Sequence, residues 1–401
     1  MFYRPKDYLR SLLPVYYEEI QSGLDFWAEH GMDWEKGGLV VYLDQKGDWY
    51  FDEKQGWFTG RAMYSFAKGY NDIEKKQRWL DAALNLYDFM VAHQFVPNGE
   101  GKLYYNMDRD GNPCKAGQRA GAHWHSPEVG ADLHVETFAI MGLSELYKAT
   151  GRADVKATLE QLIILQRKIY CNPNYFYDRI DKTDDIPEKP PMGYLMSLLC
   201  STQTVRQCVP EREEICTKWL QEYVDQAFRW YYDSERKMLY EREIESVGHS
   251  MEVAWFMLAE GLYTKNQELV DKCAEIVWSM YEVGWNKEHG GFPIAVNLVG
   301  NPGIITYQDM NIWWSMNEIE NGLIYAYIGT GDEKFLTTYR KVHEYTFGHF
   351  PDRDHGEWFG YLHYDGTPAT RNKGDNQKGP FHLYRSFYAI YELVDAYLAN
   401  A

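Results

Sequence analysis

Two kinds of helical segment alternate along the chain, and this alternation constrains the fold more than any other feature. One kind is amphipathic, with apolar residues every three to four positions and charges on the opposite face. The other kind is apolar or uncharged over most of its circumference, as a helix buried on all sides must be. The amphipathic examples are residues 75–93, 211–230 and 268–283. The apolar examples are residues 57–66, 137–146, 192–199, 253–262 and 322–328.

This alternation predicts an outer ring of helices around an inner ring. The first helix, about residues 6–31, would be an outer one, and the last, about residues 380–398, an inner one. Six such pairs make an all-α (α/α)6 barrel, a single domain over residues 1–401. An open helical solenoid is the alternative, but the buried helices and the long loops favour a closed ring.

Short segments rich in glycine and aromatic residues separate the helices. Each combines turn residues with a few alternating aromatic or aliphatic residues, the pattern of a short β-hairpin. They recur roughly every 50 to 75 residues, which indicates a repeated supersecondary unit. We expect them in the loops at one end of the barrel. The segments are residues 33–50, 99–113, 172–180, 233–243, 286–296 and 352–366.

Composition excludes several classes of partner. The formal net charge is −18, which argues against nucleic acid and against an anionic membrane surface. No segment approaches the ~20 apolar residues that span a bilayer, and the N-terminus has no signal-peptide pattern. The six cysteines form no CxxC pair, so reduced thiols in a cytoplasmic protein are expected. Aromatic residues make up 16%, a content that suits a sugar site or a wide core.

Unusual polar groups lie on the expected inner helices. Arg61 is a cation in an otherwise apolar segment, so it must pair with a carboxylate or face a polar cavity. A purely structural ion pair is the alternative. His249 and Glu252 are three residues apart and share a helix face. In the first turn, the helix dipole favours a neutral, basic histidine, so this pair can transfer a proton or simply cap the helix.

Two more segments add to this set. Glu318 follows Trp314 by one turn, which places a carboxylate beside an aromatic ring, with Asn317 next to it. His382 and Arg385 stand at the start of the last inner helix. A lone histidine there is more often structural, but the four segments together predict a central site.

Four sequence segments resemble the signature motifs of the N-acylglucosamine 2-epimerase family, which includes renin-binding proteins. They are GWFTGRAMYSFA (56–67), GHSMEVAWF (248–256), WWSMNEIE (313–320) and KGPFHLYR (378–385). The early hairpins are also similar to those of the family. The resemblance extends from about residue 33 to residue 385, and the four motifs together are highly specific.

The resemblance implies an (α/α)6 barrel that interconverts N-acetylglucosamine and N-acetylmannosamine without a redox cofactor. The family's two catalytic histidines correspond to His249 and His382, which exchange the C2 proton on opposite faces of the sugar. Its arginine corresponds to Arg61, and its motif carboxylates to Glu252 and Glu318. The residues expected to bind substrate are Trp57, His134, Glu136, Trp314, Asn317 and Arg385. The family also implies a homodimer, with ATP or another nucleotide as an effector, although no nucleotide motif is present.

Sequence details favour the N-acyl branch over relatives that act on cellobiose or mannose. Those relatives usually carry a further histidine on the third inner helix, and residues 190–201 contain none. The ending Phe-His-Leu-Tyr-Arg also resembles the N-acyl branch rather than the Tyr-His-Asn of cellobiose enzymes. There is one departure. His134-Val135-Glu136 stands where the family tends to have Tyr-Ser-Asp, on a face that can touch the sugar.

Several alternatives remain open at this point. A 2-epimerase or aldose–ketose isomerase for mannose or cellobiose would use the same histidines. A glycoside hydrolase of the same fold would need two acids, where the motifs supply two histidines. A sugar-binding or protein-interaction module would bind without C2 exchange. A zinc or manganese site has suitable donors, but their spacing fits no standard site, and we expect no metal. Those donors are His123, His125, Glu128, Asp132 and His134.

Overall fold

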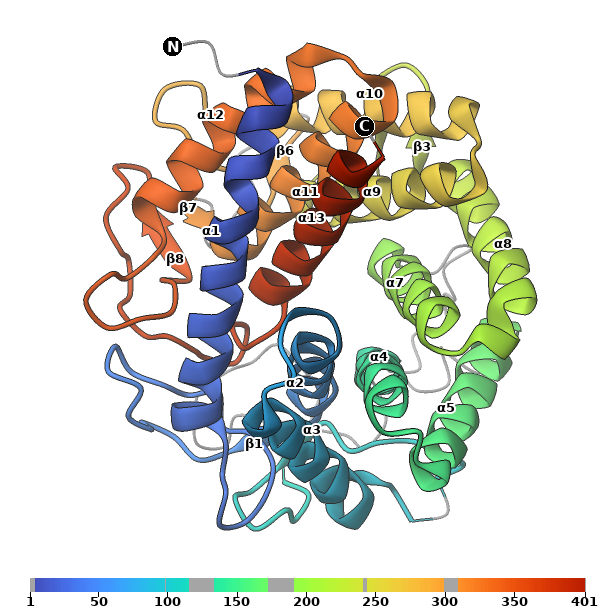
Figure 1. The fold of residues 1–401 in the computed structure, drawn as a ribbon, viewed down its shortest axis with the longest axis vertical. Coiled ribbons are helices and arrows are strands. Elements are labelled where there is room, and N and C mark those ends of the chain that lie inside the picture. Colours follow the sequence, from blue (N-terminus) through green and yellow to red (C-terminus); the bar gives the residue numbers. More distant parts are fainter. Residues whose placement is uncertain are drawn as a thin grey trace.

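Two concentric rings of helices make up the body of the protein (Figure 1). A computed structural model describes residues 4–97, 99–114, 133–171, 191–240, 244–298 and 309–400. Within these residues, the inner ring contains α2 (Gly56–Lys68), α4 (Leu133–Thr150), α7 (Met192–Cys208), α9 (Val247–Thr264), α11 (Trp313–Thr330) and α13 (His382–Ala399). The outer ring contains α1 (Pro5–Phe26), α3 (Gln77–Phe89), α5 (Ala153–Cys171), α8 (Glu213–Tyr231), α10 (Gln267–Gly284) and α12 (Glu333–His349). The predicted barrel fold is confirmed.

Burial follows the two sequence patterns. Every residue of the inner helix α2 is buried. The outer helix α3 buries one stripe, including Trp79 and Leu86, and exposes its charged face. Irregular turns extend several helices: π-helical turns at Trp27–Gly31, Gly69–Ile73 and Met90–Gln94, and a 3-10 turn at Pro210–Arg212. Among the described helices, none combines the length and the apolar character that crossing a bilayer requires.

The last inner helix closes the ring against the first. Tyr388 Oη on α13 donates to the carbonyl of Ser65 on α2 at 2.7 Å, and Ser65 Oγ donates to Pro380 O at 2.7 Å. One turn further along, Lys68 Nζ lies 2.5 Å from Glu392 Oε1. These contacts join residues more than 300 positions apart, so the closed barrel is correct and the open solenoid is wrong.

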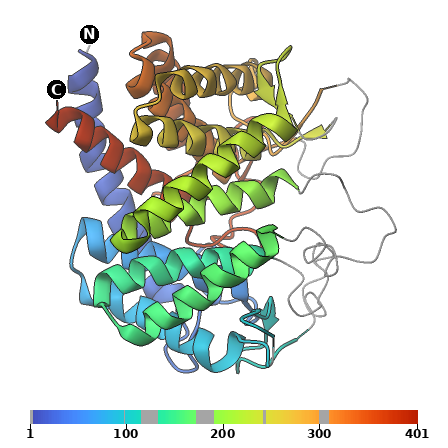
Figure 2. The ribbon, with the colours of Figure 1, turned by 90° about the vertical axis from the view of Figure 1, so that its right-hand side faces the viewer.

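Short strand pairs connect successive loops. The pairs are β1 (Lys54–Gln55) with β2 (Asn106–Met107), β3 (Tyr232–Asp233) with β4 (Met238–Leu239), β5 (Ile244–Glu245) with β6 (Val296–Asn297), and β7 (Met310–Ile312) with β8 (Tyr361–His363). Of these four pairs, β3 with β4 lies within one expected hairpin, and the other three join strands from different loops. Isolated antiparallel bridges, Leu43–Trp49, Met107–Pro113 and Pro351–Trp358, close three more of the expected hairpin segments. Strands β1, β5 and β7 lead directly into α2, α9 and α11. Figure 2 shows strands at one end of the barrel, opposite both chain termini.

The sequence repeat corresponds to a recurrent turn after the outer helices. A side-chain oxygen accepts the backbone N–H groups two and three residues further on, and the fourth residue has a positive φ. The anchors are Asp33, Asp233, Asn286 and Asp352. The left-handed residues are Gly37, Lys237, Gly290 and Gly356. The expected hairpin at residues 172–180 lies outside the described residues.

Candidate active site

The N-terminal ends of the inner helices bring the predicted site residues to the end of the barrel that carries the strands. His382 is the first residue of α13, Trp314 the second of α11, and His249 the third of α9. His134 lies in the first turn of α4, and Arg61 in the second turn of α2. The strands that precede α2, α9 and α11 each pair with a strand from another loop, which anchors the start of each of these helices.

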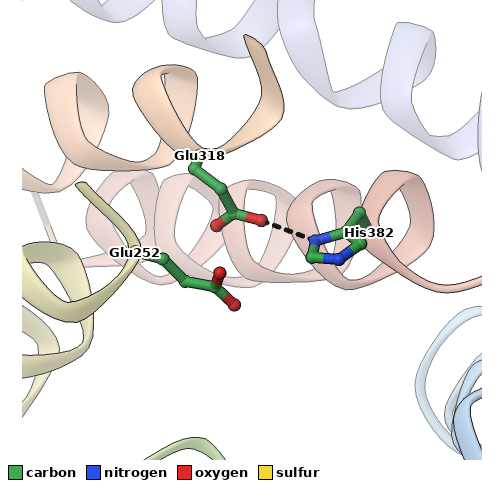
Figure 3. A group of neighbouring side chains, drawn as sticks. All are labelled: Glu252, Glu318 and His382. Atoms are coloured by element: carbon green, nitrogen blue, oxygen red, sulfur yellow. Dashed lines mark hydrogen bonds and ion pairs between the residues drawn. The ribbon is translucent and has the colours of Figure 1, made fainter. Parts of the chain in front are cut away.

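His382 and Glu318 form a hydrogen-bonded pair between α13 and α11 (Figure 3). The distance from His382 Nδ1 to Glu318 Oε1 is 2.9 Å. An ionised carboxylate only accepts hydrogen bonds, so the contact assigns the imidazole proton to Nδ1. Nε2 then keeps its lone pair, and this is the arrangement that a histidine base requires.

The surroundings keep His382 neutral. Burial, and then the positive charges of Arg385 and Arg61, lower the pKa of His382 well below 6.5. Burial raises the pKa of Glu318 above 4.5, while Arg385 opposes this shift. A neutral imidazole is the form that can take a proton, so His382 is prepared to act as a base at neutral pH.

Arg385 joins two buried carboxylates. Its Nη1 lies 2.5 Å from Glu252 Oε1, and its Nη2 contacts Glu318 Oε1. All three side chains are at most 4% exposed. Two carboxylates can share this interior because the guanidinium between them offsets part of their negative charge. Arg385 was expected to bind substrate; the structure places its charge on the two glutamates.

Trp314 contacts both candidate catalytic histidines. Its ring centroid lies 5.1 Å from that of His249 and 5.5 Å from that of His382. The indole also lies against the backbone of α9, since a Cβ added at Gly248 would be 2.2 Å from a Trp314 ring carbon. Trp314 therefore fixes the placement of the two histidines relative to each other.

Arg61 is enclosed by aromatic rings. Its guanidinium carbon lies 4.0 Å from the ring centroid of Phe138, 4.3 Å from that of Trp57 and 4.8 Å from that of Phe381. Cation–π contacts of this kind hold a charge where little water reaches it. The charge is close enough to His382 to lower the pKa of that histidine.

Comparison with known proteins agrees with this geometry. A family model described as N-acylglucosamine 2-epimerase (GlcNAc 2-epimerase) matches residues 200–386. The N-acylglucosamine 2-epimerase of Mus musculus is 27% identical over 418 residues, covering 97% of this chain and 94% of the mouse protein. The chain resembles the N-acylglucosamine 2-epimerase family. The family match includes the motifs around His249, Glu318 and His382.

Two other proteins similar to this chain are cellobiose 2-epimerases. The cellobiose 2-epimerase of Dictyoglomus turgidum is 24% identical, and the match covers 90% of this chain and 92% of the Dictyoglomus protein. A solved structure of cellobiose 2-epimerase from Bacillus thermoamylovorans B4167 superimposes with a TM-score of 0.79. The two sequences are 21% identical, and the match covers 96% of this chain and 99% of the Bacillus chain. At this identity the structural match shows the shared barrel fold.

The remaining predicted substrate contacts have partners or are enclosed. Trp57 Nε1 donates to Gln55 Oε1 at 2.9 Å. Glu136 Oε1 accepts from Leu103 N at 3.0 Å, which anchors a neighbouring loop to α4. His134 Nδ1 lies 2.8 Å from Ser197 Oγ. The side-chain amide of Asn317 is wholly buried, with no hydrogen-bond partner among the described residues.

A group of potential metal ligands coincides with the candidate catalytic residues. Donor atoms of Glu252, Glu318 and His382 lie within 4.8 Å of one another. Arg385 already supplies positive charge to both carboxylates, so a divalent cation would be repelled unless the guanidinium moved away. The donors considered from sequence at His123, His125, Glu128 and Asp132 lie outside the described residues.

Sequence reasoning missed Trp255, which it treated only as part of an apolar run. The Trp255 indole Nε1 donates to Glu318 Oε2 at 2.7 Å. A usable signal was present, since a buried tryptophan usually needs a partner for its N–H. Trp255 also follows Glu252 by three residues, on the same face of α9.

Replacing Gly248 with Ala should lower kcat about 10- to 100-fold, since the new Cβ must displace Trp314 and the histidines it contacts. Steady-state kinetics together with urea unfolding would measure the effect on catalysis separately from stability. Gly348→Ala is the matched control, because a Cβ there has nothing within 4 Å. Equal kcat values for the two variants would contradict the role given to Trp314.

Proposed function

We propose that this protein is a sugar 2-epimerase that interconverts N-acetylglucosamine and N-acetylmannosamine. The observation that carries the proposal is the pair of histidines on one tryptophan, His382 being held neutral and oriented by Glu318. The full-length similarity to the mouse N-acylglucosamine 2-epimerase supports the substrate class.

The proposed reaction exchanges the proton on C2 of the ring-opened sugar. One histidine removes this proton, and the electron pair of the C–H bond moves into an enolate whose charge is on O1. Arg61 stabilises that charge electrostatically. The other histidine then returns a proton to C2 from the opposite face, which inverts the centre. The two histidines exchange roles in the reverse direction, so the chemistry requires no redox cofactor.

Details of two inner helices support an N-acyl substrate over free mannose or cellobiose. Helix α7 spans Met192–Cys208 and contains no histidine, whereas the cellobiose and mannose enzymes usually carry one on this helix. The first turn of α13 has the Phe-His-Leu-Tyr-Arg sequence that resembles the N-acyl branch. His134, where the family pattern differs, is hydrogen-bonded to Ser197 on α7.

Incubation with N-acetylmannosamine in D2O tests this proposal. NMR should show N-acetylglucosamine forming with deuterium at C2, and parallel reactions with and without ATP would test the expected effector. Deuterium incorporation without product would indicate exchange on one face only. Absence of both would make the proposal wrong and would favour a binding module.

The second candidate is a 2-epimerase or isomerase that acts on cellobiose or mannose, and the 24% identity to a cellobiose 2-epimerase favours it. The outcome with each sugar separates the candidates. An N-acyl sugar cannot pass from its enolate to a stable ketose, whereas mannose would give fructose. We expect a higher kcat/KM with N-acetylmannosamine and little or no fructose from mannose. An aryl glycoside would reveal hydrolase activity.

The pH dependence of kcat/KM should be bell-shaped, because epimerisation needs one neutral and one protonated histidine. On the acid limb of this profile, kcat/KM falls as pH decreases because the histidine pair takes up a second proton. Because burial and neighbouring cations lower the pKa of His382, we expect the midpoint of this limb below pH 6.5. Profiles measured with N-acetylmannosamine and with N-acetylglucosamine should have the same midpoint on the acid limb. A midpoint above 6.5 would mean that His382 is not the neutral member of the pair.

A further inference from the structure

Trp255 links the two helices that carry the catalytic glutamates. It lies on α9, one turn after Glu252, and its indole N–H reaches Glu318 Oε2 on α11 at 2.7 Å. Trp255 is 4% exposed and Glu318 is fully buried. A hydrogen bond from a neutral donor to an enclosed carboxylate is one of the stronger kinds in a protein.

Both oxygens of Glu318 are occupied by protein groups. Oε1 meets His382 Nδ1 and Arg385 Nη2, and Oε2 meets Trp255 Nε1. If the carboxylate rotated part of a turn about its terminal bond, the hydrogen bonds to Trp255 and His382 would both be lost. The indole therefore helps to fix the plane in which the carboxylate meets His382.

We propose that Trp255 is a positioning residue for C2 proton exchange: its N–H orients the Glu318 carboxylate, which in turn holds His382 with its proton on Nδ1 and with Nε2 free. The part of this inference that concerns catalysis rests on the proposed function. The orientation of Glu318 by Trp255 does not depend on the identity of the sugar.

Trp255 also separates Glu318 from a cavity of about 220 Å³ on the far side of the catalytic cluster. Cys200, Phe256, Tyr325 and Arg385 line this cavity together with Trp255. The space is large enough for several waters. A smaller ring at position 255 would give such water a route to Glu318, where it would compete with His382 for the carboxylate.

Trp255→Phe removes the N–H and keeps an aromatic ring. We expect kcat to fall about 10- to 100-fold, with KM changing less than about two-fold. The acid limb of the pH profile should move to higher pH, since a carboxylate that loses one donor interacts more strongly with a protonated His382 and so raises the pKa of the histidine pair. Trp313→Phe is the matched control, because Trp313 is equally buried and its N–H has no hydrogen-bond partner among the described residues.

A double-mutant cycle tests whether Trp255 acts through Glu318. If it does, Trp255→Phe combined with Glu318→Ala should be no slower than Glu318→Ala alone. Additive losses would show a packing role and overturn the proposal. So would a kcat and an acid limb for Trp255→Phe that match those of Trp313→Phe.

The indole N–H signal gives a readout that does not depend on activity or on the folding of Trp255→Phe. In a ¹⁵N-labelled sample with 14 tryptophans, site-specific labelling identifies the Trp255 N–H cross peak. We expect this peak to shift strongly in Glu318→Ala, and an unmoved peak would overturn the inference even if the wild type epimerises the sugar. A shifted peak in a protein that epimerises no sugar would instead reject the proposed function.

Discussion

His382→Asn should lose at least the ~10²–10⁴-fold in kcat that a general acid–base group contributes, while the barrel stays folded. Asparagine keeps a polar side chain at the start of α13 but cannot take a proton at neutral pH. Conversion of N-acetylmannosamine followed by NMR measures the loss, and circular dichroism checks the fold. A variant that keeps more than about a tenth of the wild-type rate would remove His382 from the mechanism.

The protein contains a close control for this substitution. His343 on the outer helix α12 lies 2.9 Å from a carboxylate oxygen of the buried Glu320, the same distance as between His382 and Glu318. Both histidine side chains are 12% exposed. His343→Asn should therefore cost similar stability and leave kcat unchanged.

His249→Ala should lose epimerisation as His382→Asn does, but each variant retains one base. Each should still exchange the C2 proton of one epimer with D2O, without inverting the centre. Exchange of opposite epimers by the two variants would assign a histidine to each face of the sugar. Exchange of both epimers by one variant would contradict the two-base mechanism.

Arg385→Met should destabilise the protein by about 3–5 kcal/mol, because Glu252 and Glu318 would remain buried without their shared counter-ion. Urea unfolding measures this loss. Adding Glu252→Gln should recover part of it. Arg353→Met is the control. Arg353 forms an ion pair of 2.8 Å with Glu19, but the arginine is exposed, so its loss should cost at most about 1 kcal/mol.

The loss of unfolding free energy in Arg385→Met should depend on pH in a definite direction. Burial already raises the pKa of Glu318 in the folded protein, and loss of the guanidinium would raise it further. A group with a raised folded pKa destabilises the protein as pH rises from the unfolded pKa towards the folded one. The deficit should therefore shrink as pH falls towards about 4.5. A deficit independent of pH would attribute the loss to packing alone.

The helical barrel could be predicted from sequence because burial on all sides leaves a direct mark. Segments such as 57–66 and 253–262 carry few charges around their whole circumference, and only an inner ring accommodates them. The turns could also be predicted, since Asp33 or Asp352 followed by glycine four residues later has a local physical cause. The strand pairs could not, because β1 meets β2 across about 50 residues and no local pattern specifies that partner.

Side-chain orientation in the site was harder to predict for a similar reason. Spacing placed His382 and Arg385 on one helix, but it could not show that Arg385 pairs with Glu252 on α9. Trp255 looks like any apolar residue until Glu318 lies beside it. Contacts between different inner helices depend on how the helices are rotated within the ring, and that rotation is a property of the whole barrel.

The position of α13 in the chain has a consequence for synthesis on the ribosome. This helix closes the barrel against α2, and it also supplies His382 and the counter-ion for Glu252 and Glu318. Until it emerges, a nascent chain lacks both the proposed second base and the cation that pairs with Glu252 and Glu318. A chain released before residue 382 would lack the proposed activity and would leave Glu252 and Glu318 without their counter-ion, and proteases and chaperones recognise such incompletely folded chains.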